Sequence, residues 1–458
     1  MPLGNASVLS AILGEECDSD LDTYGFIVWV LLVLSCFYLI AKLAAVWLQY
    51  AEVAACRLRL SHDLASALLA LADTAPALAC TLLGFALGAP ELGLGGAVGA
   101  AFFDSLCVFG VCLTSTKRLV RMWWYPAARD VAFHMVAITA LALVLEAEPP
   151  QWWQALFLVL TYAAYVLYAA FNERICKQLG LKPPKGLEKA YFGMEWLSVE
   201  VEQLEVAEEG PIWPVRPSRP ARFHCLARDA EEVVMELVQL ASFDASEVGR
   251  AFEGFHAEGE ASVRGGALEV ASALRRTCYV KGQLAAKAPG TLWACLVRWG
   301  AAVIALAVAL LAMVYALLDG ASRLSCVAGV APAREKRGLS CLGFTVIAAG
   351  IRVPRMILSM SDAKCGSPER AAARAVQSSL CIVSLGIGLP WCMTGPRGKA
   401  EADPSCLDYL LLLAGAQLLQ LFLVLAGELT VRAGGLLLVG YVGSMVYALV
   451  CFYQTLGT

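Results

Sequence analysis

Charged residues are scarce in this chain. They make up 16% of its 458 residues, whereas hydrophobic residues make up 59%, and the mean hydropathy is +0.66. Soluble proteins carry about 25% charged residues, so the composition excludes an ordinary soluble domain and indicates a membrane protein. The formal net charge of −4 provides no basic surface and argues against nucleic acid as a partner.

Motifs for metal binding and enzyme chemistry are also missing. The 17 cysteines form no paired CxxC motif, and we expect them to act as small hydrophobic residues rather than as a disulfide framework or zinc site. There is no EF-hand spacing, nucleophile–base constellation or nucleotide loop. The GLGGAVG run at 93–99 is interpreted as a helix-packing turn, because a dinucleotide fingerprint needs a preceding strand. We therefore expect neither an enzyme nor a cofactor.

Apolar runs of membrane-spanning length occur throughout the rest of the chain. A helix of about 20 residues crosses a hydrocarbon core of about 30 Å. The expected spans are 24–50, 64–87, 92–113, 131–145, 152–171, 299–318, 339–360, 375–391, 409–425 and 436–452. With an odd number of spans in each half, the halves have opposite orientations. We therefore predict an all-α membrane protein with two inverted five-helix repeats.

The predicted spans divide the chain into four segments. Residues 1–23 form an amino-terminal segment, 24–171 the first membrane repeat, 172–290 a polar loop domain and 291–458 the second membrane repeat. Inside the loop domain, alternation predicts a strand at 197–206 and amphipathic helices at 229–240 and 267–276. Its acidic run, 195–209, is interpreted as a solvated face. The sequence identifies no partner for this loop.

Basic residues predict the orientation of the membrane helices. They follow the first and third spans, whereas residues 1–23 and the loops at 88–91 and 146–151 contain no Lys or Arg. The positive-inside rule then places the amino terminus outside and residues 172–290 in the cytosol. Residues 1–23 also lack the basic start of a cleaved signal peptide. We expect a multi-pass protein of the plasma membrane or an organelle membrane, with the lipid bilayer as a partner.

Two further expectations come from loops next to the spans. Residues 117–129, which include Arg129 and several aromatic residues, are interpreted as a basic interfacial loop. Cys392 and Cys406 flank a short loop that is expected outside, where oxidation is favoured. We hypothesise a disulfide between them, with two free thiols as the alternative.

Two carboxylates, Asp73 and Asp104, lie within the second and third spans. A charge at the bilayer centre costs at least ~2.5–3.5 kcal/mol, so both side chains are expected to face a protein interior. Pro76 follows Asp73 and is predicted to break the helix at mid-depth, an arrangement that many transporters use for a midplane site. The alternative is an acid paired inside the bundle beside a tolerated proline.

Several of these spans carry a family resemblance. TAPALACTLLG (74–84) and LGLGGAVGAAFFDSLCVFGV (92–111) resemble the first alpha-repeat of cation/calcium exchangers. MWWYPAARDVAFHM (122–135) is most similar to the potassium-dependent sodium/calcium exchangers. LGFTVIAAGIRVPRMILS (342–359) and QSSLCIVSLGIGLPW (377–391) are similar to the second alpha-repeat. The resemblance implies an antiporter that transports Na⁺, Ca²⁺ and K⁺ across a bilayer, without a cofactor.

The chain departs from this family at the ion site. The repeat-one glutamate of the family falls on Ala77 and its asparagine on Asp104, while the repeat-two aspartate falls on Arg355 and a threonine–serine pair on Ile351 and Arg352. Ca²⁺ needs six to eight oxygen ligands, so these replacements remove ligands and add positive charge. Asp73 lies four residues before Ala77 on about the same helix face and is a candidate replacement for the missing glutamate.

The remaining family positions fall on small residues. In repeat two the asparagine and aspartate fall on Ser379 and Ile382, while Thr74 and Ser378 are conservative matches. Asp73 and Asp104 are the candidate metal ligands. The whole candidate ion-site region is Asp73, Thr74, Ala77, Asp104, Ser105, Arg352, Arg355, Ser378 and Ser379.

Three functions follow from this combination. The first is a divergent cation/calcium antiporter whose relocated acids still bind an ion, and the second is a transport-inactive relative with a regulatory or interaction role. The third is a carrier in which Arg352 and Arg355 bind an anionic substrate.

If the repeats pack about a pseudo-two-fold axis, at least one Asp–Arg pair is predicted between them, because an unpaired charge at that depth is costlier than the pair.

Overall fold

The computed structural model describes ten stretches of the chain, and they are helical. The described residues are 23–57, 62–87, 89–116, 120–146, 152–181, 292–327, 335–364, 368–394, 404–426 and 429–457. Ten helices in these stretches are long and apolar enough to cross a membrane, which confirms the predicted class. The strand and the two amphipathic helices predicted between 197 and 276 lie outside the described residues.

The first membrane repeat contains five spans. Its elements are α2 (Thr23–Arg57), α3 (His62–Ala86), α4 (Pro90–Phe103), η1 (Asp104–Val108), α5 (Phe109–Thr114), α6 (Trp124–Glu146) and α7 (Trp152–Gln178). The third span consists of α4, η1 and α5. Helix α7 continues past residue 171 and ends in a Schellman motif, in which Leu181 donates to Cys176 O and Gly180 donates to Lys177 O. Gly180 has the positive φ of 65° that this cap requires.

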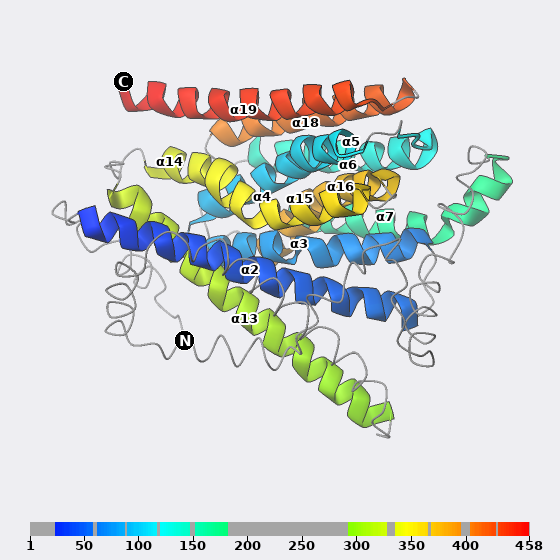
Figure 1. The fold of residues 1–458 in the computed structure, drawn as a ribbon, viewed down its shortest axis with the longest axis horizontal. Helices are drawn as coiled ribbons and strands as arrows, with labels where there is room; N and C mark the ends of the chain where they lie inside the picture. Colours follow the sequence, from blue (N-terminus) through cyan, green and yellow to red (C-terminus); the bar gives the residue numbers. More distant parts are fainter. Residues whose placement is uncertain are drawn as a thin grey trace, which may run out of the picture.

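The second membrane repeat also contains five spans. Its elements are α13 (Leu292–Val327), α14 (Glu335–Leu342), η3 (Gly343–Ile347), α15 (Ala348–Lys364), α16 (Pro368–Cys381), η4 (Ile382–Gly386), α17 (Ile387–Thr394), α18 (Pro404–Leu425) and α19 (Val431–Gly457). Helices α2 and α13 pack together on one side of the bundle, and α18 and α19 lie on the opposite side (Figure 1). Helices α3, α4, α15 and α16 lie between them.

The two repeats contact each other reciprocally. Helix α7, the last of the first repeat, packs against α17, and helix α19, the last of the second repeat, packs against α5. Helices α5 and α17 are the second halves of equivalent spans. This exchange is the packing expected of two repeats related by a pseudo-two-fold axis.

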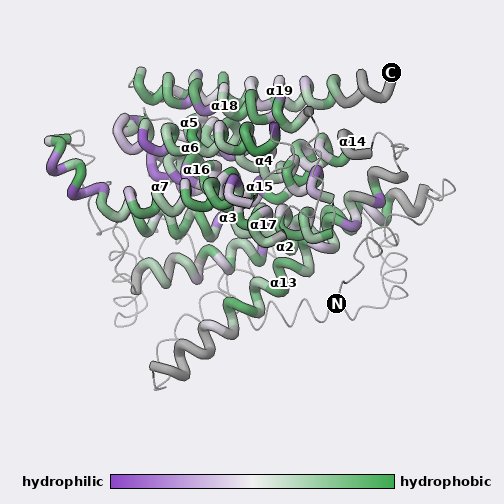
Figure 2. The backbone as a smooth tube through the Cα atoms, turned by 180° about the vertical axis from the view of Figure 1, so that it is seen from behind, coloured by the Kyte–Doolittle hydropathy of each residue, from purple (hydrophilic) through white to green (hydrophobic). Residues whose placement is uncertain are grey.

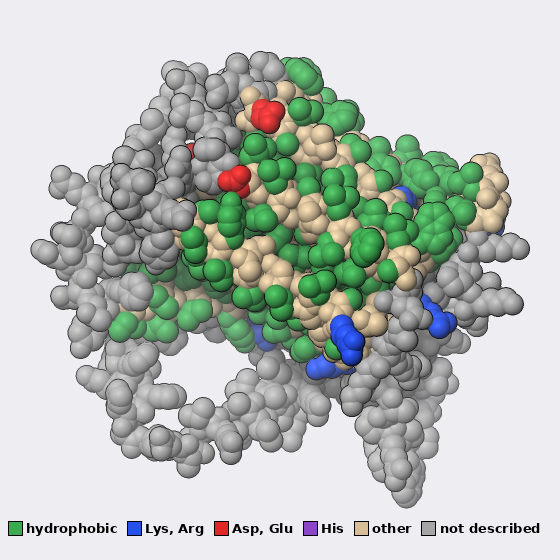
Figure 3. All heavy atoms as spheres, turned by 90° about the horizontal axis from the view of Figure 1, so that it is seen from above, with side chains coloured by type: hydrophobic (Ala, Val, Ile, Leu, Met, Phe, Trp, Pro, Cys, Tyr) green, Lys and Arg blue, Asp and Glu red, His purple; other side chains and the backbone are tan. Residues whose placement is uncertain are grey.

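Burial separates a protein-facing centre from an apolar outer surface. In α4 every residue from Glu91 to Phe103 is buried, whereas α2, α13, α18 and α19 expose many large apolar side chains. In Figure 3 apolar side chains are spread across the described part of the face, which shows few charged side chains, and the hydropathy colouring in Figure 2 shows mostly apolar residues along α18 and α19. An apolar exterior of this kind suits lipid, so the chain is a multi-pass integral membrane protein.

The repeats approach closely where α4 crosses α14 and η3. A Cβ on Gly95 would collide with the Ser340 carbonyl oxygen, and one on Gly99 would collide with the Phe344 carbonyl oxygen. Glycine at these positions therefore lets the two backbones touch, as small residues do at helix interfaces in membranes.

The helix break predicted at Pro76 is wrong. Helix α3 continues from His62 to Ala86 with Pro76 inside it, and α15 likewise contains Pro354. A proline removes one hydrogen bond of the helical ladder. The packing of α3 against α2, α4 and α16 supports the rest of the helix, so the alternative of a tolerated proline is what the structure contains. The interruptions are instead the π-helical segments η1, η3 and η4.

The disulfide hypothesised between Cys392 and Cys406 is also wrong. Neither cysteine forms a disulfide in the structure. The Cys406 side chain is buried, and its Sγ lies 3.4 Å from Ser340 Oγ, so the thiol packs between α18 and α14. Cys392 lies half-buried on α17.

Candidate functional site

Two buried aspartates pair with two buried arginines at the centre of the bundle. Arg352 Nη2 lies 2.7 Å from Asp104 Oδ2, and Arg355 forms an ion pair with Asp73. Asp73 and Asp104 belong to the first repeat and the arginines to the second. The predicted Asp–Arg pairing between the repeats is therefore confirmed, in two copies.

One turn of α15 supplies both arginines. Arg352 and Arg355 are three positions apart, so they leave the helix on neighbouring parts of one face. Arg352 is among the largest fully buried side chains of the described residues, and its Nη1 donates to the Asp73 carbonyl oxygen at 2.7 Å. Arg352 therefore contacts both aspartates: it pairs with the carboxylate of Asp104 and donates to the backbone carbonyl oxygen of Asp73.

A π-helical turn presents Asp104 to Arg352. Asp104 is the first residue of η1, and its carbonyl oxygen accepts the amide hydrogen of Phe109, five residues on. The extra residue in such a turn shifts the direction of the side chains relative to a regular α-helix. The same kind of turn, η3, precedes the arginines, where Ala348 donates to the Gly343 carbonyl oxygen.

Ser105 and Ser379 form a second contact between the repeats. Their hydroxyl oxygens lie 3.0 Å apart, and Ser379 Oγ also donates to the Ala101 carbonyl oxygen at 2.9 Å. Gln417 Nε2 donates to Ser105 Oγ at 2.5 Å, and Gln420 Nε2 donates to the Ser105 carbonyl oxygen. The residue next to Asp104 is thus held by two amides of α18.

The other candidate site residues are buried but do not join the ion pairs. Thr74 Oγ1 donates to the Leu71 carbonyl oxygen at 2.8 Å and lies 3.3 Å from Cys381 Sγ. Ala77 is 1% exposed and contributes a methyl group to the core. Ser378 Oγ is buried and has no hydrogen-bond partner in the structure.

Gln417 and Gln420 are site residues that the sequence reasoning missed. They occur three positions apart in LLLLAGAQLLQLFLVL (410–425), an otherwise apolar span, and both are fully buried. Polar side chains inside a membrane helix usually face the bundle interior. That signal is present in the sequence, but glutamine carries no charge and is therefore not selected by a rule for ionisable groups.

A second buried charged cluster lies near the starts of α3 and α6. Arg129 Nη2 lies 2.7 Å from Asp130 Oδ1, and Arg129 Nη1 lies 3.7 Å from Asp63 Oδ2. Asn172 Nδ2 donates to Asp63 Oδ2 at 2.5 Å. The prediction that Arg129 belongs to an interfacial loop is wrong, because α6 begins at Trp124 and its first turns carry Arg129 into the interior.

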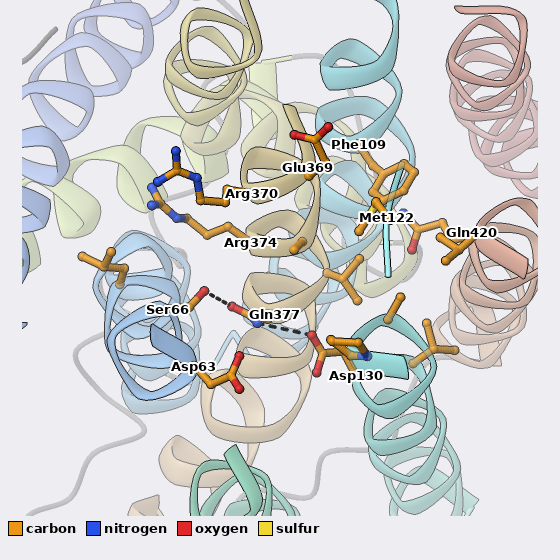
Figure 4. A pocket seen from close by; sticks show the side chains of 17 residues that line it. Asp63, Ser66, Phe109, Met122, Asp130, Glu369, Arg370, Arg374, Gln377 and Gln420 are labelled. Carbon is orange, nitrogen blue, oxygen red and sulfur yellow. Dashed lines mark hydrogen bonds between the residues drawn. The ribbon is translucent and has the colours of Figure 1, made fainter. Parts of the chain in front are cut away.

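A cavity of about 50 Å³ lies beside this cluster, between helices of both repeats. Ser66 Oγ donates to Gln377 Oε1 at 2.5 Å, and Gln377 Nε2 donates to Asp130 Oδ2 at 3.3 Å (Figure 4). Glu369, Arg370, Arg374 and Gln420 also line the cavity.

The charges of the central site are balanced by the protein's own side chains. Its two carboxylates face two guanidinium groups, so their formal charges cancel. Among the described residues there is no group of three or more His, Cys, Asp or Glu side chains that could hold a metal ion. Ca²⁺ requires several convergent oxygen ligands, and here the carboxylates are already engaged by arginine.

Comparisons with known proteins relate both membrane halves to one family. The family model described as "sodium/calcium exchanger protein" matches residues 28–171 and 299–450. Sodium/potassium/calcium exchanger 2 of Rattus norvegicus is 34% identical over 127 residues, which are 27% of this chain and 19% of that protein. Sodium/potassium/calcium exchanger 1 of Homo sapiens is 33% identical over 153 residues, which are 32% of this chain and 14% of that protein. The matches thus span less than a fifth of these relatives.

A solved structure shares the fold. The crystal structure of the H⁺/Ca²⁺ exchanger CAX superposes with a TM-score of 0.54 over 91% of this chain and 82% of that one, at 11% identity. At this level of identity the likeness concerns the arrangement of helices and not the chemistry of the site.

Proposed function

Because the chain belongs to the sodium/calcium exchanger protein family, we propose that it is an exchanger-fold membrane protein with a divergent ion site and weak or absent Ca²⁺ exchange. The observation that carries this proposal is the pairing of both central aspartates with arginine. An exchanger must bind and release cations at such a site. Here the cationic groups belong to the protein itself.

The charge on the arginines makes this arrangement persistent. A guanidinium group stays protonated at every physiological pH, so it does not leave by losing a proton. A Na⁺, K⁺ or Ca²⁺ ion that entered would have to displace a buried guanidinium from its carboxylate. Removing one partner of a buried ion pair costs about 3–5 kcal/mol, and Ca²⁺ would recover only two carboxylates from Asp73 and Asp104.

The ion pairs also connect the two repeats. Alternating access requires one repeat or bundle to move against the other around the site. Arg352 and Arg355 on α15 hold Asp73 on α3 and Asp104 on η1, so this motion would have to separate buried charges. We therefore propose a regulatory or interaction role on an exchanger scaffold, with the bilayer as its surroundings.

The geometry weighs against an anion carrier. Such a carrier would offer Arg352 and Arg355 to a carboxylate or phosphate of its substrate. Both guanidinium groups are instead engaged by aspartates of the same chain. Retained cation transport through relocated Asp73 and Asp104 is the remaining alternative, and flux decides between it and our proposal.

The experiment measures Ca²⁺ uptake into proteoliposomes loaded with Na⁺, with and without K⁺. We expect the unmodified protein to give little uptake, and the double variant Ala77→Glu, Arg355→Asp to raise it by restoring acidic side chains. The variant Ala77→Gln, Arg355→Asn matches these side chains in shape without their charge and should not raise uptake. Robust uptake by the unmodified protein would show that the site still works as an exchanger.

The proposed orientation follows the basic loops of the first repeat. The amino terminus and the loop ends at 88–91 and 146–151 would face away from the cytosol, and residues 172–290 would lie in it. The starts of α3, α6 and α16 then lie at the cytosolic end of the bundle. Localisation of the expressed protein distinguishes the plasma membrane from an organelle membrane.

A further inference from the structure

We propose that the cavity lined by Ser66, Asp130, Glu369, Gln377 and Gln420 binds a small monovalent cation such as Na⁺ or K⁺, together with water. This accessory site is separate from the central Asp–Arg pairs, and its residues are not among the candidate ion-site residues of the sequence analysis. The proposal holds whether or not the central site transports an ion.

Gln420 supplies an unused acceptor to the cavity. The side chain is 1% exposed, and its Nε2 donates to the Ser105 carbonyl oxygen. This bond fixes which end of the amide is the nitrogen, since a reversed amide would place two oxygens together. The other end, Oε1, is buried and has no hydrogen-bond partner in the structure. A buried carbonyl oxygen of this kind costs free energy unless a donor or a cation meets it.

Two other polar residues of the cavity, Ser66 and Gln377, each direct a hydrogen at an oxygen atom of the protein. The Ser66 hydroxyl hydrogen goes to Gln377 Oε1, and Gln377 Nε2 goes to Asp130 Oδ2. Asp130 is balanced by Arg129, and Glu369 on the first turn of α16 brings a further carboxylate to the wall. Figure 4 shows the long side chains of Arg370 and Arg374 extending together to the side away from Gln420 and Asp130. The part of the cavity next to Gln420 therefore favours a positively charged occupant.

Size and ligand number restrict this occupant. The volume of about 50 Å³ accommodates about three to five water molecules, at about 10–15 Å³ each, whereas pockets for organic substrates measure about 300–1,000 Å³. Ca²⁺ needs six to eight oxygens and usually several carboxylates, and no metal-holding group of three acidic, His or Cys side chains occurs among the described residues. A monovalent ion that keeps part of its water fits these limits.

The site is connected to the centre through Gln420. This residue reaches the cavity with one end of its amide and holds the backbone of Ser105 with the other, and Ser105 follows Asp104 in η1. An ion on Gln420 Oε1 would strengthen the amide's hold on the π-helical turn that presents Asp104 to Arg352. The cavity also contains groups from α3 and α6 of the first repeat and from α16 and α18 of the second. Binding there would favour the packed arrangement of the repeats.

The test measures the melting temperature of the purified full chain in detergent as NaCl or KCl replaces N-methyl-D-glucamine chloride at constant ionic strength. A specific site gives a saturable rise, since a ligand that binds the folded state stabilises it. We expect such a rise, and we expect CaCl₂ at matched ionic strength to add nothing to it. Equilibrium binding of ²²Na⁺ or ⁸⁶Rb⁺ provides the direct readout.

Variants then locate the ion. Gln420→Met keeps the length of the side chain and removes the acceptor, and Glu369→Gln removes the carboxylate. Each change should raise the cation concentration at half-saturation by about tenfold or more, because a polar contact with a charged group is lost. Gln417→Met is the matched control, because Gln417 holds Ser105 from the same helix but does not line the cavity. Its cation response should remain even if its melting temperature falls.

A further variant keeps the test valid if Gln420→Met does not fold. Ala373→Met fills the cavity with apolar volume and changes no polar group. It should abolish both the cation-dependent stabilisation and the binding of labelled cation. The proposal is overturned if alkali cations give no more stabilisation than N-methyl-D-glucamine. It is equally overturned if the response survives in Gln420→Met and Ala373→Met.

Discussion

Arg352 and Asp104 form a buried ion pair between the two membrane repeats, with Arg352 Nη2 2.7 Å from Asp104 Oδ2 and side chains that are 1% and 0% exposed. Coulomb attraction alone does not make such a pair stabilising, because both charges lose their hydration. Its consequence is asymmetric. Removing one partner leaves an unpaired charge in the interior, whereas replacing both partners with apolar residues leaves no unpaired charge there.

The first prediction uses this asymmetry. Arg352→Met should destabilise the protein by about 3–5 kcal/mol, because it leaves Asp104 buried without its guanidinium, and Asp104→Leu should do the same to Arg352. The double variant should be more stable than either single variant. Melting temperatures of the four proteins in one detergent measure the coupling.

An exposed ion pair provides the control. Lys177 and Glu173 are 2.7 Å apart on α7 with side chains 75% and 57% exposed, so Lys177→Met should cost less than about 1 kcal/mol. Additive effects of the Arg352 and Asp104 changes would contradict a coupled pair.

The second prediction concerns the crossing of α4 with η3. Gly99→Ala should lower the melting temperature, because the added Cβ meets the backbone of Phe344 and the side chain of Ala348. Gly443→Ala on α19 is the matched control, since its Cβ meets nothing within 4 Å and alanine is the better helix former. Equal effects of the two changes would show that the close approach does not limit packing.

The third prediction concerns topology. A protease added to the outside of intact cells or to right-side-out vesicles should leave residues 172–290 uncut, because the basic loops of the first repeat predict that this segment lies in the cytosol. Cleavage should appear once the membrane is permeabilised. An epitope tag at the amino terminus should show the opposite accessibility. Cleavage of residues 172–290 in sealed right-side-out vesicles would contradict the proposed orientation.

The helices and the central pairing were predictable from the sequence because their physical causes are local or strong. Long apolar runs have one stable structure in a membrane, and charges inside them must find partners. Asp73 and Arg355 could thus be expected to meet although they lie in different repeats. The family resemblance indicated which stretches of the two repeats meet at the ion site, and composition alone does not provide this.

The remainder of the site depends on tertiary packing. Pro76 indicated a break, but the neighbours of α3 hold the helix together around it. The charged and aromatic residues around Arg129 predict an interfacial loop, because such residues usually occur at the membrane surface. In the structure Arg129 pairs with Asp130, and this pairing allows both side chains to lie inside the bundle in the first turns of α6. The π-helical turn at Asp104 has no composition signal that separates it from an α-helix. Gln420 becomes significant only when the cavity beside it is known.

The last prediction separates the central site from an exchanger's cation site without measuring transport. If Arg352 and Arg355 occupy the central site, replacing EGTA with Ca²⁺ should leave the melting temperature of the unmodified protein unchanged. The reason is that both central carboxylates are already paired with arginine. The double variant Ala77→Glu, Arg355→Asp adds two carboxylates and removes one guanidinium, so it should gain a Ca²⁺-dependent rise. The uncharged pair Ala77→Gln, Arg355→Asn should gain none, which excludes an effect of side-chain shape. A Ca²⁺-dependent rise in the unmodified protein that disappears when Asp73 and Asp104 are both changed to Asn would show instead that these aspartates still bind the ion, and that the arginines yield to it.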